Sequence, residues 1–220
     1  MPDRFMEISL QSLIPIPLKD RKLHEQSGIW KKNCLFHQAE WIKIQAPSGT
    51  GKTSFQHILY GIRHDYEGSV MYNHQNLKDF DEDALAKLRQ EQLSVIFQDL
   101  KLFGNLTALE NIELKRLLSP GFRTSDSIQE MASLLGIDGI LHQPAAICSY
   151  GEQQRIAIIR ALMQPFNWLI MDEPFSHLDD ANIQKAASLI ASECKARGAG
   201  LIITDLEADN HFNYQRVLYL

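Results

Sequence analysis

The chain has 220 residues, of which 45% are hydrophobic and 22% charged, a composition that is typical of a soluble globular protein with a substantial core. Its formal net charge of -5 argues against a general nucleic-acid binder, because neutralising phosphates requires a clustered basic surface. No segment reaches the ~18 to 20 apolar residues of a membrane span, and three cysteines without metal-binding spacing fit a reduced, cytosolic compartment.

The first part of the chain alternates short strand-like segments with helical ones. Strands are predicted over residues 5–10, 28–30, 41–45, 68–73 and 93–97. Helices are predicted over 53–61 and 81–92. From residue 99 to 147 the pattern becomes helical, and Ser127 with Glu130 is expected to form a capping box at the start of one of these helices.

The second part contains the most apolar segments. EQQRIAIIRALM at 152–163 is apolar nearly all round and predicts a helix in the interior. The continuous apolar run WLIM at 168–171 indicates a central parallel strand buried on both faces, and further strands are predicted over 200–204 and 214–220. Strands that alternate with helices predict an α/β protein with a parallel sheet, into which residues 99–147 are inserted as a helical unit.

The segment APSGTGKTS has the context of a phosphate-binding loop, because a predicted strand precedes it and a predicted helix follows. Its glycines allow successive N–H groups to face a phosphate, Lys52 supplies a positive charge, and the Thr53 hydroxyl can bind Mg²⁺. An alanine stands where the usual pattern begins with glycine. The candidate nucleotide-binding residues are Ala46, Pro47, Ser48, Gly49, Thr50, Gly51, Lys52, Thr53 and Ser54.

The phosphate loop does not define the reaction, since several families, nucleotide monophosphate kinases among them, carry such a loop. A second candidate site follows the buried strand 168–171, where Asp172 and Glu173 stand side by side. Such a pair could hold a metal, act as a base, or end the strand in solvent.

The segment SYGEQQRIAIIRAL at 149–162 narrows the choice. Here the chain resembles the ATP-binding cassette (ABC) ATPases, whose signature is Leu-Ser-Gly-Gly-Gln or -Glu followed by Gln-Gln-Arg. Gln98 in VIFQD resembles the family's Q-loop, LIMDEP its Walker B segment, and SHLD, which ends in Asp179, its D-loop. The resemblance covers nearly the whole chain.

This resemblance implies a P-loop NTPase fold with a RecA-like core, N-terminal antiparallel strands and an inserted helical subdomain. The core is expected to comprise residues 1–98 and 148–220. Residues 99–147 are expected to form the helical subdomain, which carries the surface for a partner and leads into the signature.

The same resemblance implies ATP and Mg²⁺ as cofactors. Thr53, Gln98 and Asp172 are expected to bind the metal. Glu173 is expected to act as the general base for the attacking water, assisted by Lys52 and Gln98.

The signature residues Ser149, Gly151 and Glu152 are expected to meet the γ-phosphate of an ATP that a second cassette subunit holds, at the N-terminus of a helix. Ser149 and Glu152 are also spaced as a capping box, and both interpretations can hold together. One chain cannot close its own site in this way. The resemblance therefore implies a homodimer or heterodimer of cassettes around two ATP molecules.

The end of the strand 200–204 departs from the family. Relatives carry a histidine after the threonine, whereas Asp205 follows Thr204 here, so that either an acid faces the phosphate or the loop has lost a residue. His211 lies six residues beyond Asp205, too far to reach the γ-phosphate without rearrangement. A stabiliser of developing charge is thus expected to be absent, and hydrolysis to be slow or dependent on a partner.

Two further departures concern the signature and the base. Cys148 and Tyr150 replace leucine and glycine, and the Tyr150 ring could stack on the facing nucleotide, obstruct it or point away. No clear aromatic residue for adenine stacking stands between Leu10 and Gln26. Trp30 is expected to belong to the core instead.

Within the family, LTALENIEL at 106–114 is similar to the lipoprotein-release, macrolide-export and cell-division group. This implies an ATPase subunit on the cytoplasmic face of the inner (plasma) membrane, bound to an integral membrane permease. The alternative is a regulatory cassette that binds ATP with little or no hydrolysis. A cassette acting on DNA or ribosomes is disfavoured, because only 50 residues separate Gln98 from Ser149 and the chain holds one cassette. The end at Leu220 predicts no C-terminal regulatory domain.

Overall fold

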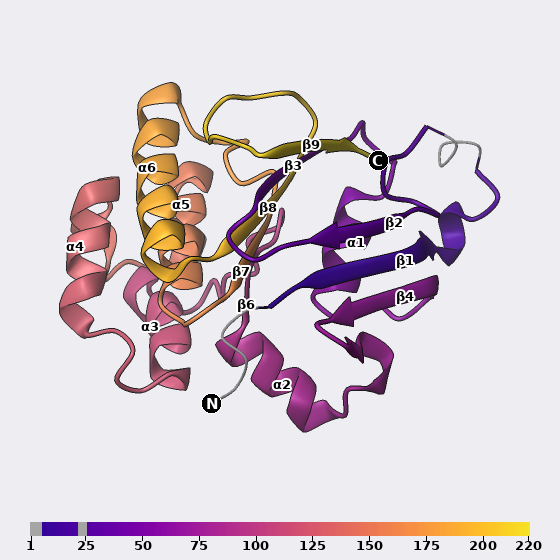
Figure 1. The fold of residues 1–220 in the computed structure, drawn as a ribbon. Helices are drawn as coiled ribbons and strands as arrows, with labels where there is room; N and C mark the ends of the chain where they lie inside the picture. Colours follow the sequence, from indigo (N-terminus) through magenta and orange to yellow (C-terminus); the bar gives the residue numbers. More distant parts are fainter. Residues whose placement is uncertain (1–5, 22–25) are drawn as a thin grey trace.

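The computed structural model describes residues 6–21 and 26–220. Two sheets organise the molecule (Figure 1): an antiparallel sheet with the strand order β2-β1-β4-β5 and a parallel sheet with the order β6-β7-β8-β3-β9. The α/β class, the parallel sheet and the N-terminal antiparallel strands are therefore as predicted.

The antiparallel sheet is built by the N-terminal part of the chain. Its strands are β1 (Ile8–Pro15), β2 (Asn33–Phe36), β4 (Tyr66–Tyr72) and β5 (Gln75–Asn76). The predicted strand at 28–30 is wrong, because the Ser27 hydroxyl accepts hydrogen bonds from the N–H groups of Ile29 and Trp30 and closes a turn there. The strand that pairs with β1 lies three residues further on.

The parallel sheet is the platform for the candidate site. Its strands are β3 (Trp41–Gln45), β6 (Leu93–Ile96), β7 (Trp168–Asp172), β8 (Gly200–Asp205) and β9 (Arg216–Tyr219). Every residue of β7 is buried, as the apolar run predicts for a strand covered on both faces.

Helices cover the two faces of the parallel sheet and separate two cores. They are α1 (Lys52–Leu59), α2 (Glu82–Glu91), α5 (Tyr150–Leu162) and α6 (Asp180–Arg197), with short 3-10 turns at Ile16–Leu18 and Leu77–Asp79. One core packs α5 and α6 against one face of the sheet, and the other packs α1 between the opposite face and the antiparallel sheet. β7 contributes alternate side chains to both, Leu169 to the first and Ile170 to the second.

The helical insertion lies between β6 and α5 and packs on α5 and α6 (Figure 1). It contains α3 (Ala108–Leu118), α4 (Ser125–Leu135) and 3-10 turns at Asp138–Ile140 and Ala145–Ile147. The predicted capping box of Ser127 and Glu130 is wrong: α4 begins two residues earlier, after Thr124, and has no side-chain cap. The corresponding capping box in this insertion is at Thr107, which opens α3.

No helix among residues 6–21 and 26–220 is long and apolar enough to cross a membrane. The three cysteines are buried and unpaired. Burial raises the pKa of the Cys194 thiol to about 12, so this thiol is chemically quiet at neutral pH.

Candidate functional site

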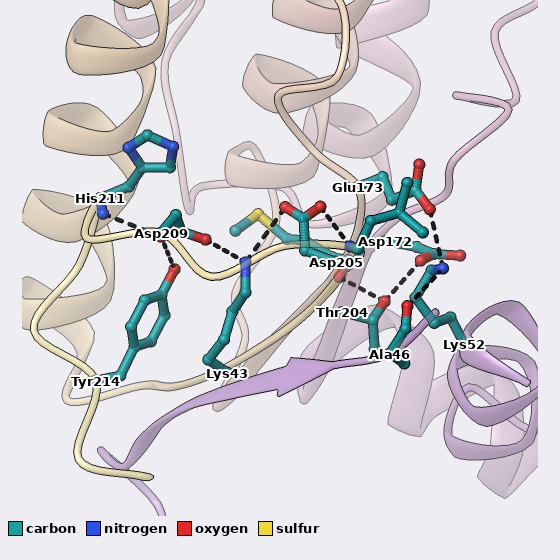
Figure 2. Close-up of polar contacts among 12 residues, drawn as sticks. Lys43, Ala46, Lys52, Asp172, Glu173, Thr204, Asp205, Asp209, His211 and Tyr214 are labelled. Carbon is teal, nitrogen blue, oxygen red and sulfur yellow. Dashed lines mark hydrogen bonds and ion pairs between the residues drawn. The ribbon is translucent and has the colours of Figure 1, made fainter. Parts of the chain in front are cut away.

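Three neighbouring strands end at one edge of the parallel sheet. In the register of β3, β8 and β7, Gln45 pairs with Asp205 and Asp172 pairs with Thr204. The segments that follow these strands therefore meet at this edge, as Figure 2 shows for Ala46, Lys52, Asp172 and Asp205. In open α/β sheets, this carboxyl edge is where ligands bind.

The loop after β3 has the conformation of an anion cradle. Gly49 and Gly51 have φ angles of 81° and 107°, a left-handed region that side chains rarely tolerate. Within the described part of the chain, the backbone N–H groups of Ser48, Gly49 and Gly51 have no intramolecular acceptor. The loop leads into the N-terminus of α1, whose free N–H groups and partial positive charge favour a phosphate. The predicted context of strand, loop and helix is confirmed.

Trp30 supports this loop from the interior. Its indole Nε1 donates to the carbonyl oxygen of Thr50 at 3.0 Å, and the ring packs edge-on against Phe55. A Cβ atom on Gly51 would lie 3.1 Å from the same indole ring. Trp30 is 1% exposed, which agrees with the predicted core position and leaves no face for adenine. Part of the region searched for an adenine platform, residues 22–25, lies outside the described residues.

The two acids after β7 have different surroundings. Asp172 is fully buried, and its carboxylate accepts hydrogen bonds from the hydroxyls of Thr53, at 2.9 Å, and Thr204, at 2.6 Å. Glu173 has other partners: one carboxylate oxygen lies 3.3 Å from Lys52 Nζ, and the other accepts a hydrogen bond from Gln98 Nε2 at 3.3 Å.

The backbone conformation at Glu173 contributes to the different surroundings of the two acids. Glu173 adopts a φ of 46°, an unusual conformation for a residue with a side chain, at the turn where β7 ends. Its N–H donates to the Thr204 carbonyl at 2.9 Å, and its own carbonyl accepts from the buried Gln154 side chain at 3.3 Å. Local backbone strain at this turn thus separates a buried carboxylate from one that is turned toward Lys52.

The oxygen atoms of Thr53 and Asp172 fit a hard divalent cation such as Mg²⁺, which prefers oxygen ligands and retains several waters. Among the residues that the structure describes, no group of three or more His, Cys, Asp or Glu side chains could hold a metal alone. This donor set suits a metal that is bound together with a phosphate. Lys52, whose ammonium also donates to the Ala46 carbonyl at 3.0 Å, lies beside it.

The predicted signature residues lie at the start of α5. Ser149 is the N-cap, and its N–H and hydroxyl donate to the Glu152 carboxylate at 2.7 and 2.8 Å, which confirms the capping box. These hydrogen bonds lower the pKa of Glu152. A Cβ on Gly151 would lie 2.9 Å from the His177 carbonyl oxygen. In the described structure no hydrogen bond joins this helix start to the chain's own phosphate loop.

The Tyr150 ring packs at a tilt against a residue of its own chain. Its ring lies 4.1 Å from the imidazole of His177, centroid to centroid, with a tilt of 57°. The Tyr150 side chain is also 46% exposed and lines a hollow of about 310 Å³ together with Thr53, His57 and Gln98. The ring therefore lies on the same surface as the phosphate loop and is held there by His177.

This pairing gives a measurable prediction. We expect Tyr150→Ala and His177→Ala to be coupled in a double-mutant cycle by about 0.5 kcal/mol, the lower end for aromatic pairs, because both rings are exposed. Urea denaturation of the two single variants and the double variant measures this coupling. Tyr150→Phe is the control, because it keeps the ring and should leave the free energy of unfolding nearly unchanged. Strictly additive effects of the two alanine substitutions would exclude the stacking.

The end of β8 differs from the expectation of an acid facing the phosphate. Asp205 does stand directly after Thr204, but its carboxylate lies 3.3 Å from the ammonium of Lys43 (Figure 2). His211 lies beyond Asp209 and packs edge-on against Phe175, so the structure does not bring this imidazole to the phosphate loop.

Sequence reasoning missed three residues that organise this edge: Lys43, Gln154 and Thr204. A signal existed for Lys43, since a lysine within the apolar strand WIKIQ requires a buried partner. Thr204 and Gln154 gave no such signal, because their contacts with the turn at Asp172 and Glu173 span more than fifteen residues.

Comparison with known proteins decides the family. A family model described as ABC transporter matches residues 32–176, well over half of the chain. This chain belongs to the ABC transporter family. The five sequence motifs indicate the same family.

Individual relatives refine this placement among ABC cassettes. The chain is 32% identical to the lipoprotein-releasing system ATP-binding protein LolD of Legionella pneumophila, over 81% of this chain and 80% of that protein. It is 29% identical to the macrolide export ATP-binding/permease protein MacB of Bdellovibrio bacteriovorus, over 91% of this chain. This chain spans less than a third of the length of the ATP-binding/permease relatives that it matches. The predicted subgroup is confirmed.

A solved ABC cassette has the same fold. The dimeric structure of MJ0796, a bacterial ABC transporter cassette, superposes with a TM-score of 0.81 and covers 97% of this chain and 94% of its own. At 24% identity this likeness concerns the fold. The antiparallel sheet, the parallel sheet and the inserted helical subdomain are thus arranged as in an ABC ATPase.

Proposed function

We propose that this chain is the ATP-hydrolysing subunit of a membrane complex and that two cassettes close around two Mg-ATP molecules to drive an integral membrane permease. The observation that carries the proposal is the meeting of two pairs at one sheet edge: Thr53 with Asp172, and Lys52 with Glu173. The first pair supplies oxygen ligands for a metal, and the second places a cation and a base on the adjoining side.

The chain's own residues then have distinct roles. Thr53, Asp172 and Gln98 would hold Mg²⁺, and bound Mg²⁺ would neutralise phosphate charge. Glu173 would take the proton of the attacking water, a contribution of about 10²- to 10⁴-fold in rate. Lys52 and the loop N–H groups would orient the β- and γ-phosphates.

The start of α5 supports a dimer. Ser149 and Gly151 stand at a helix N-terminus whose free N–H groups suit a phosphate, yet no hydrogen bond of the described chain ties them to their own phosphate loop. We infer that a second cassette presents its ATP to this helix start. Closing the site from the partner side would exclude bulk solvent and leave the attacking water beside the phosphate.

Different segments of the chain have different roles in this proposal. Residues 1–98 and 148–220 would bind nucleotide, and the helical residues 99–147 would contact the permease on the cytoplasmic side of the membrane. Exposed large apolar side chains on this insertion support such a contact: Phe103, Leu117, Leu118 and Ile147. LolD and MacB are named for lipoprotein release and macrolide export, so a related export or release system is the natural partner.

Co-purification from membranes tests the partner. The wild-type chain, expressed with the permease from the same gene neighbourhood, should elute with it in mild detergent. Leu117→Ser/Leu118→Ser should abolish this association and leave ATP binding intact, whereas Val217→Ser, an exposed apolar position on β9, should retain it. Association that survives the Leu117 and Leu118 substitutions would contradict the docking surface.

A second function is favoured by one observation. Since Asp205 pairs with Lys43 and no imidazole stands at the end of β8, the site lacks one cation-capable group. The chain could then act as a regulatory cassette that binds ATP with little hydrolysis. Single-turnover hydrolysis, measured with and without the permease, separates the two: a regulatory cassette stays slow in both, whereas a motor accelerates with its partner.

A further inference from the structure

Lys43 is a charged residue in the middle of a buried strand. Its side chain on β3 is only 2% exposed, and a buried ammonium is strongly unfavourable unless charged partners surround it. Two carboxylates do so: Asp205 Oδ2 lies 3.3 Å from Nζ, and Asp209 accepts a hydrogen bond from it (Figure 2). Both acids belong to the segment that begins where β8 ends. The ammonium thus ties β3 to that segment.

Asp209 is the deeper of the two acids. Besides Lys43, it receives the Tyr214 hydroxyl at 2.7 Å and the His211 N–H at 3.0 Å. Burial opposes its ionisation, but the hydrogen bonds from Lys43, Tyr214 and the His211 N–H, together with the charge of Lys43, hold the pKa of Asp209 below its usual value. Asp209 is therefore a charged partner of Lys43.

Asp205 is the acid that adjoins the nucleotide site. Its Oδ1 accepts the Leu206 N–H at 2.7 Å, so each of its carboxylate oxygens has a local partner. Its backbone carbonyl accepts the N–H of Ala46, the first residue of the phosphate loop, at 2.9 Å. The preceding residue, Thr204, holds Asp172. Asp205 thus contacts the phosphate loop directly through its backbone, and it is the chain neighbour of the residue that binds Asp172.

A free carboxylate at this place would oppose nucleotide binding. Like charges that are only partly solvated repel over several ångströms with little screening by salt, and a triphosphate carries more charge than a diphosphate. The Asp205 side chain is 27% exposed, so water screens it only in part. An ammonium held 3.3 Å from it offsets part of this repulsion, and the remainder falls as the carboxylate is held further from the phosphate.

We propose that Lys43 is a positioning residue for nucleotide binding, which holds the Asp205 carboxylate away from the phosphate loop and offsets part of its charge. The inference rests on the proposed nucleotide site. It explains how the chain tolerates an acid at the end of β8, next to a site for phosphate. Lys43 itself touches neither phosphate nor metal in this role.

A merely structural role for Lys43 makes a different prediction. If its ion pairs only hold the segment 205–214 in place, their loss weakens ATP and ADP binding alike, and removing the Asp205 charge does not restore either. If Lys43 holds the Asp205 carboxylate away from the loop, then Asp205→Asn has the larger effect where Lys43 is absent, and this effect is larger for ATP than for ADP.

The test compares Asp205→Asn in two backgrounds. One is the wild-type chain, where Lys43 keeps Asp209 as its partner. The other is Lys43→Met/Asp209→Asn, which removes the ammonium together with the deeper acid and so leaves no buried unpaired charge at Asp209. ATP and ADP affinities are measured by titration calorimetry at constant Mg²⁺ and salt, and thermal unfolding is recorded for each variant.

In the wild-type background, Asp205→Asn should change ATP affinity by less than about twofold. In the second background it should tighten ATP binding by about tenfold and ADP binding by less. Equal effects in both backgrounds, or equal effects on ATP and ADP, would overturn the inference. If the wild-type chain itself binds no ATP, the proposed function fails first, and this inference with it.

A second series guards against misfolding. Lys43→Gln keeps hydrogen-bond donors beside both carboxylates but removes the charge, and Lys43→Gln/Asp205→Asn removes the charge of Asp205 as well. The double variant should regain ATP affinity relative to Lys43→Gln by a similar factor, with matched unfolding temperatures. Failure to regain it in a folded protein would overturn the inference.

Discussion

Replacing Glu173 with glutamine should lower the rate of ATP hydrolysis by at least about a hundredfold while Mg-ATP binding persists. The amide cannot accept the proton of the attacking water, which removes the contribution of a general base. The substitution preserves the size of the side chain and a hydrogen bond to Gln98, which now lies 3.3 Å away. Asp172 and Thr53 are untouched, so the proposed metal ligands remain.

Phosphate-release assays and light scattering measure both consequences. Because Glu173→Gln holds unhydrolysed ATP, we expect its mass in solution to double when Mg-ATP is added and to revert when EDTA removes the metal. Glu91→Gln, at an exposed position on α2, is the control and should behave as wild type. A Glu173→Gln protein that hydrolyses ATP within about threefold of the wild-type rate would show that another group is the base.

Replacing Trp168 with alanine should cost about 3 to 5 kcal/mol of folding free energy, a large part of the stability of an ordinary domain. Trp168 opens β7 and is fully buried. Its indole Nε1 donates to the Met6 carbonyl at 2.8 Å, and its ring packs so closely on Gly200 that a Cβ there would lie 2.4 Å from it. The substitution therefore leaves a cavity and an unpaired carbonyl under the strand that carries the acids.

Urea denaturation measures the loss. Trp168→Phe keeps much of the apolar volume but loses the hydrogen bond to Met6, so it should lie between wild type and Trp168→Ala. Val217→Ala, on the exposed side of β9, should change the free energy of unfolding by less than about 0.5 kcal/mol. A loss below about 1.5 kcal/mol for Trp168→Ala would mean that the core repacks around the missing ring.

Much of the candidate site could be predicted because its signals are local. The phosphate loop needs two glycines with positive φ between a strand and a helix, and Gly49 and Gly51 stand there with those angles. The capping box of Ser149 and Glu152 needs residues three apart at the start of a helix, and the structure has it. In both cases neighbours along the chain supply the whole interaction.

The errors arose where a local signal had a competitor. Ser127 and Glu130 have the spacing of a capping box, but α4 begins at Ser125, so both residues lie inside the helix. Residues 28–30 are apolar enough for a strand, but the Ser27 hydroxyl binds the N–H groups that a strand would have paired. In each case, the sequence pattern placed the start of an element at the wrong residue.

The amino-acid order alone was enough for the α/β class, the nucleotide loop, the acids after β7 and the family, because each depends on residues adjacent in the chain. Strand order, the different partners of Asp172 and Glu173, and the pairing of Lys43 with Asp205 and Asp209 required the folded protein. These contacts join segments more than a hundred residues apart. Electrostatic and hydrogen-bond energies depend on the distance between groups in space. The spacing of residues along the chain does not give that distance.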